Sequence, residues 1–327
     1  MTRAGWEGVR LGTGFLLTRI ESDTDGWYRW SRSPGPLRPT PFTPAPSALR
    51  SALDGLPALP VRPVLGRPVD DRRDYRAPQA HAVAAELSGA AGPFGPLSGE
   101  RRQQLWHLFA GAGELLRRLH AEVPRPAMAG PPCGTERLAS WLRTGEGPGT
   151  APRLHAATVE RLGQRRLRRA LDWCRALAAP APDAVFLAGG ATTGSLVPGA
   201  RARPGALLIG EELARGPAEY DVGWLLGELA ELRLLALART GDDQSVSACE
   251  EAARHLLRGY GGDHLDPVPL GRVAALRVLT HAHDYAAYVA WTAELSDYLD
   301  VIAALLDAEG APAVPAAVPQ HPAHPPL

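Results

Sequence analysis

Two short apolar segments, each ending at a glycine, constrain the fold of this chain more than any other feature. Val185 to Ala188 and Ala206 to Ile209 both stop at glycine before a polar loop, a pattern typical of short buried strands. The second loop leads through Asp221 into an apolar helix predicted from Val222 to Leu237. We therefore expect a pocket between the strand ends and this helix.

The same stretch resembles the C-lobe of the aminoglycoside phosphotransferase family, small-molecule kinases related to protein kinases. The catalytic loop of that family runs apolar-apolar-His-Gly-Asp, then a spacer and an Asn. Here Ala188 falls at the His, Gly190 at the catalytic Asp and Ser195 at the Asn. Further along, the family has a second Asp that holds magnesium, and Gly210 stands there. Asp221 matches the Asp of a downstream block that holds the family's fold together, so the resemblance implies a structural role for it.

This resemblance implies an α+β fold of two lobes, similar to protein kinases. A small N-lobe containing strands and one short helix is expected over residues 1–95, and a mostly helical C-lobe over residues 96–309, with the degenerate catalytic loops at 184–223. Residues 310–327 are rich in Pro, Ala and His, a composition that predicts disorder.

Local patterns place further elements. Val9 to Ile20 and Gly26 to Ser31 are predicted strands, and Asp70 to Arg76 is charged enough to indicate a solvated hairpin or strand edge. Ser47 to Leu56 resembles the kinase helix that carries an ion-pairing glutamate. From Ser98 to His120, apolar residues recur at helical spacing behind a serine N-cap.

The chain contains no lysine, and all 35 of its basic residues are arginine. Kinases of this fold place a lysine on the third N-lobe strand, where it pairs with the nucleotide phosphates and with the helix glutamate. Arg29 lies where that strand is expected and is either a cationic substitute or an exposed strand residue. The helix offers only Asp54 as an acid. The sequence therefore predicts that this ion pair is absent.

The groups needed for phosphoryl transfer are also missing from the two loops. That reaction requires a carboxylate to orient the attacking hydroxyl and metal ions to neutralise the phosphates. Glycine at positions 190 and 210 supplies neither, and Ser195 is a weak magnesium ligand at best. We predict no cofactor, and no metal site.

A polar cluster near the expected cleft supplies the candidate site residues. Glu211 and Glu212 are candidates for general acid or base catalysis, or for a displaced cation site, although adjacent glutamates are also common at exposed helix starts. The candidate ligand-binding residues are Thr192, Thr193, Ser195 and Arg215.

Composition excludes several classes of protein. The formal net charge of the 327 residues is zero, which gives no overall electrostatic attraction to nucleic acid or to a membrane surface. No uncharged apolar run approaches the length of a membrane span. We therefore expect a cytoplasmic protein that binds neither nucleic acid nor membrane.

Three functions remain open. The first is a pseudokinase, a binding or accessory subunit for a peptide, a metabolite or a partner protein. The resemblance further implies an actinobacterial natural-product pathway, and with it a second hypothesis: a repurposed enzyme that acts on a ribosomally made peptide, in a lanthipeptide-type dehydration or cyclisation step. The third is a residual phosphotransferase that uses displaced acids such as Glu211.

Overall fold

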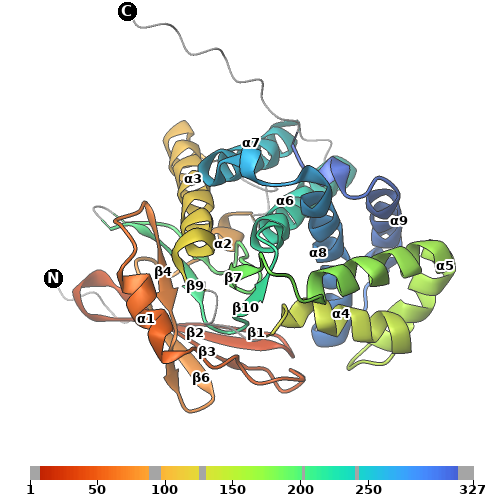
Figure 1. Cartoon of the computed structure of the whole chain (residues 1–327), viewed down its shortest axis with the longest axis horizontal. Helices are drawn as coiled ribbons and strands as arrows, with labels where there is room; N and C mark the ends of the chain where they lie inside the picture. Colours follow the sequence, from red (N-terminus) through yellow and green to blue (C-terminus); the bar gives the residue numbers. More distant parts are fainter. Residues whose placement is uncertain (1–7, 88–96, 125–129, 201–202, 240–242, 316–327) are drawn as a thin grey trace, which may run out of the picture.

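The computed structural model describes residues 8–87, 97–124, 130–200, 203–239 and 243–315. Most of its strands gather on one side and most of its helices on the other (Figure 1). This is the two-lobed, α+β arrangement that the sequence predicts.

The N-lobe is built on a five-stranded antiparallel sheet in the order β1-β2-β3-β6-β5. The strand predicted from Val9 to Ile20 is in fact two strands, because the chain reverses at Thr13, whose hydroxyl accepts hydrogen bonds from the amides of Phe15 and Leu16. The strands are β1 (Val9–Gly12), β2 (Leu16–Ser22), β3 (Tyr28–Pro34), β5 (Arg67–Val69) and β6 (Arg72–Ala77).

The charged segment from Asp70 to Arg76 belongs to a hairpin of β5 and β6, one of the two predicted alternatives, and does not lie at the edge of the sheet. Its first residues form the turn, but β6 lies inside the sheet, between β3 and β5. The strand alternates, so that Arg73 and Tyr75 are buried while Arg72 and Arg76 are exposed. The number of charges in the segment does not predict which of its residues are buried. That depends on the alternation of side chains between the two faces of a strand.

A second sheet crosses the expected boundary between the lobes. After helix α1 (Ser47–Asp54), strand β4 (Val61–Leu65) pairs in parallel with β9 (Gly205–Ile209), with Val61 opposite Gly205. On its other side β9 pairs antiparallel with β8 (Leu196–Val197). All five residues of β9 are buried, as expected for a strand that has neighbours on both sides.

The C-lobe is helical. Ser98 caps α3 by accepting a hydrogen bond from the amide of Arg101, as the sequence predicts. A two-stranded sheet of β7 (Val185–Leu187) and β10 (Ala214–Gly216) carries the two polar loops. The helices are α2 (Val83–Leu87), α3 (Gly99–Glu122), α4 (Cys133–Thr144), α5 (Ala151–Ala178), α6 (Glu219–Arg239), α7 (Asp243–Tyr260), α8 (Pro267–Tyr288) and α9 (Glu294–Asp307), with short 3₁₀ turns at Thr24–Gly26, Gly262–His264 and Ala311–Ala313.

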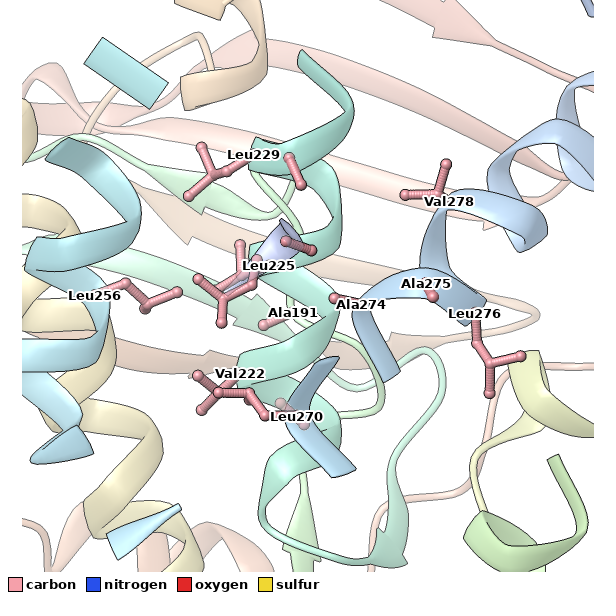
Figure 2. Packing of buried hydrophobic residues seen from close by; sticks show 14 of the residues in the cluster. Ala191, Val222, Leu225, Leu229, Leu256, Leu270, Ala274, Ala275, Leu276 and Val278 are labelled. Carbon is pink, nitrogen blue, oxygen red and sulfur yellow. The ribbon is translucent and has the colours of Figure 1, made fainter. Parts of the chain in front are cut away.

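Helix α6 lies at the centre of the main core, packed against both α7 and α8. Figure 2 shows Val222, Leu225 and Leu229 along α6, with Leu256 of α7 on one side and Ala274 of α8 on the other. All five are at most 1% exposed. This core fixes the position of α6 and α8, which both contribute to the site described below.

The first residues of the predicted C-terminal tail are ordered. Gly310 follows α9 with a positive φ of 74°, and the 3₁₀ turn after it buries Ala313. Disorder from Gly310 onward is therefore wrong for residues 310–315, because this segment packs against α8. Residues 316–327 lie outside the described part of the chain.

Among the described residues, the structure contains no helix that is both long and apolar enough to span a membrane.

Candidate functional site

A cavity of about 740 Å³ separates the two lobes. Its roof comes from β1, β2 and β3, and its floor from the loops after β7 and β9. One face of α8 completes it, through Arg277, Thr280, His281 and Asp284, which are spaced so that they share one side of a helix. This interlobe cleft is the pocket that the sequence predicts between the strand ends and the apolar helix.

Asp221 holds the backbone of the loop after β7 from below. Its two carboxylate oxygens accept hydrogen bonds from the amide of Ala188, at 2.7 Å, and from that of Gly190, at 2.9 Å. His120 lies 3.3 Å from the same carboxylate and 2.9 Å from the hydroxyl of Tyr260. Asp221 is fully buried. A buried carboxylate with this many partners fixes the loop in one conformation.

The two glycines at the kinase positions have conformations that side chains rarely adopt. Gly190 has a φ of 93°, and a Cβ placed there would lie 3.1 Å from the indole nitrogen of Trp224. Gly210 has a φ of 126°. An aspartate at either position would be strained by its backbone. At Gly190 it would also meet Trp224.

The predicted ligand-binding residues divide into two groups. Thr192 and Ser195 line the cleft and bond to each other, with 3.2 Å between their hydroxyl oxygens. Thr193 turns away from the cleft, since its amide and hydroxyl both donate to Glu228 of α6. Arg215 lies on β10 and donates to the carbonyl of Ala181, outside the residues that line the cleft.

Glu211 lines the cleft but is held by the N-lobe. Arg32 of β3 donates to its two carboxylate oxygens at 3.1 and 3.3 Å, and the hydroxyl of Tyr75 donates to it at 2.5 Å. Arg32 also donates to the carbonyl of Gly194, at 2.7 Å. Burial, and then the charge of Glu211, raise the pKa of Tyr75 well above its usual value. Glu211 therefore joins the two lobes through a largely buried ion pair with Arg32.

Glu212 is held by two other arginines. Arg38 donates to it at 2.7 Å and Arg137 of α4 at 3.2 Å, and these guanidinium groups are 2% and 11% exposed. Arg137 also contacts Asp284, at 3.4 Å. Burial alone would raise the pKa of Asp284, but Arg137 and His283 outweigh it and lower this pKa to about 2. Each carboxylate of the cleft is therefore paired with a cation.

The tip of the β1–β2 hairpin closes one end of the cleft. Gly14 donates from its amide to the carbonyl of Tyr288, at the end of α8, at 2.7 Å. The ring of Phe15 lies between two guanidinium groups, 4.1 Å from that of Arg38 and 4.4 Å from that of Arg137. The arginines that hold Glu212 thus hold this hairpin as well.

Sequence reasoning missed the arginines that dominate the cleft. Arg29 points away from it and pairs with Glu21 at 53% exposure, whereas Arg32, on the buried face of β3, enters it. Trp30 lies on that face too, is 2% exposed and donates to the carbonyl of Gln79. The alternation of Trp30 and Arg32 was the available signal, because residues two apart on a strand share a face.

In the described part of the chain, no three His, Cys, Asp or Glu side chains lie close enough to hold a metal ion together. His281 contacts Glu231, and His283 contacts Asp284. These two histidines have different partners, as their spacing on a helix predicts.

The fold defines a class of protein: a two-lobed kinase-like fold of the aminoglycoside phosphotransferase type. Among solved structures, it is similar to the amicoumacin kinase hAmiN in complex with AMP-PNP, Ca²⁺ and Ami, with a TM-score of 0.52, 13% identity, and 94% of this chain and 90% of that chain covered. A choline/ethanolamine kinase family protein from Mesorhizobium loti also matches, with a TM-score of 0.46, 17% identity, and 94% and 89% covered. No family model and no curated protein matches the sequence.

Proposed function

We propose that this protein is a pseudokinase, which binds a peptide, a metabolite or a partner protein and does not transfer phosphate. The observation that carries this proposal is that both catalytic positions are glycines with positive φ. At Gly190 the space where a side chain would project is taken by Trp224. A side chain is therefore opposed at Gly190 by both packing and backbone conformation, and at Gly210 by the backbone conformation.

The remaining acids of the cleft support the same proposal. A general base must accept a proton, and a magnesium ligand must offer oxygens that are free of other cations. Glu211 is bound by Arg32 and Tyr75, and Glu212 by Arg38 and Arg137. To act in catalysis, either glutamate would have to leave a buried arginine without its charged partner, which is costly.

The roof of the cleft also differs from that of an active kinase. Kinases keep a lysine on β3 for the nucleotide phosphates, whereas Arg32 of this chain already donates to Glu211 and to the Gly194 carbonyl. Those donors are not available to a phosphate unless the contact between the lobes opens.

A titration of thermal stability with ATP, ADP and GTP, each with and without magnesium, tests this proposal. A ligand at one hundred times its dissociation constant adds about 2.7 kcal/mol to the free energy of unfolding, so binding would raise the melting temperature measurably. We expect no magnesium-dependent rise and no release of ADP from ATP.

A double variant tests whether Glu211 and Glu212 replace the missing catalytic acids. A magnesium-dependent rise, together with ADP release that the E211Q/E212Q variant abolishes, would overturn the proposal and show residual phosphotransfer. The variant G190D/G210D is expected to remain inactive, because its new carboxylates would be attached to strained backbone. If that variant gained ATP turnover, the packing argument would be wrong.

A further inference from the structure

Arg277 of α8 projects into the cleft beside the position of the lost catalytic aspartate. Its aliphatic stem passes over Gly227 of α6, where a Cβ would lie 2.8 Å from it. Its guanidinium carbon lies 5.7 Å from the centre of the Trp224 ring. That indole in turn covers Gly190. An indole N–H therefore lies where kinases keep a carboxylate, and a guanidinium lies next to that indole.

The guanidinium of Arg277 has unused hydrogen-bonding capacity. Its ion-pair contacts with Glu228, at 3.9 Å, and with Glu231, at 3.7 Å, are longer than hydrogen bonds. Both carboxylates have closer partners, since Glu228 accepts from Thr193 and Glu231 contacts His281. The buried Nε of Arg277 has no partner either. Arginine offers five N–H donors, and no described residue accepts from any of them.

The other half of the cleft is apolar. Its walls are aliphatic and aromatic side chains from the N-lobe sheet, from the connection between the lobes and from β9, which include Val9, Leu16, Ile20, Trp30, Ala80 and Leu208. A cavity of this size and character suits a small organic ligand, whose orientation is set by a few polar groups.

We infer that the cleft binds an amphiphilic organic anion, with its carboxylate or phosphate on Arg277 and its apolar body under the N-lobe sheet. This inference rests on the proposed function, because it fills the cleft with a ligand other than a nucleotide. The anion satisfies donors that have no other acceptor, and charge-assisted hydrogen bonds to a guanidinium are among the stronger ones in proteins.

Calorimetric titration of the full chain with eight-carbon probes tests the inference. Octanoate and octyl phosphate carry the two candidate anionic groups, and octanol and octylammonium carry the same chain without a negative charge. We expect at least one anion to bind about tenfold or more tightly than octanol, the gain from one or two charged hydrogen bonds. Inorganic phosphate alone is expected to bind more weakly than octyl phosphate.

Three variants test whether the probes bind in this cleft. Arg277→Gln is expected to lose the preference for anions while binding octanol as before, and Arg277→Lys to restore part of it. Ala80→Phe fills the apolar half without changing any charge and is expected to weaken all four probes, so the test survives if Arg277→Gln does not fold.

Equal affinity for octanoate, octyl phosphate and octanol would overturn the inference, as would unchanged anion binding by Arg277→Gln. These failures are distinct from failure of the proposed function, which is measured by magnesium-dependent nucleotide binding and ADP release.

Discussion

The loop after β7 and the loop after β9 reach the same cleft but are held in opposite ways. The first is held through its backbone, because buried Asp221 accepts the amides of Ala188 and Gly190 from below. The second is held through its side chains, because Glu211 and Glu212 are bound by arginines of the N-lobe and α4. The first loop thus takes its shape from a buried residue of another element, whereas the acids of the second loop are held in ion pairs.

Replacing Asp221 should have the largest effect of all, because it removes the support of the first loop. Asp221→Asn places an amide donor opposite backbone N–H donors in a fully buried site. We expect the free energy of unfolding, measured with urea, to fall by about 3 kcal/mol. Asp172→Asn is the control, since this exposed side chain is paired with Arg175. A loss no larger than that of the control would show that the backbone alone fixes the loop.

Neutralising Glu211 should weaken the attachment of the second loop to the N-lobe. Glu211→Gln leaves Arg32, which is 5% exposed, without a charged partner, and we expect a loss of about 2 kcal/mol in the same measurement. Arg32→Met in the same chain should recover part of this loss, because it removes the unpaired cation. Additive effects of the two substitutions would mean that the pair does not act as a unit.

Acid should weaken the network around Glu212 through Asp284. The pKa of Asp284 is lowered to about 2, so its ionised form is favoured in the folded state. Its contribution is complete above the usual aspartate pKa and is lost as the pH falls from about 4 towards 2, a change of about 2 kcal/mol. The stability difference between the wild type and Asp284→Asn should shrink over this interval. If it stayed constant, the ion pair with Arg137 would not be the cause.

Removing the Phe15 ring should have the smallest effect, because the hairpin keeps its backbone bonds. Phe15→Ala loses contacts with two guanidinium groups, each worth about 0.5–1 kcal/mol at sites of partial exposure. We expect faster hydrogen exchange at the amide of Gly14, which donates to Tyr288, with exchange in α6 unchanged. Exchange that accelerates throughout α6 would indicate that the hairpin stabilises the entire C-lobe.

Local patterns in the sequence were enough to predict most helices and strands, and the strands that carry the site. The apolar runs before Gly189 and Gly210 form β7 and β9, and the periodic leucines after Ser98 form α3. The contacts of the cleft could not be predicted in this way. Arg32 and Glu211 are 179 residues apart, and no local period relates them. The direction of Thr193 depends on Glu228 of a later helix, so its place in a polar cluster did not predict its partner.

The pairing of β4 with β9 makes the two lobes parts of one folding unit. β9 is buried on both faces, and without β4 it would expose an unpaired row of backbone donors and acceptors along an apolar strand. Such an edge favours pairing between molecules. A C-lobe made without residues 61–65 would therefore be prone to aggregation. During synthesis, β4 also cannot pair until β9 has been made, more than one hundred residues later. Contacts this distant in sequence form slowly.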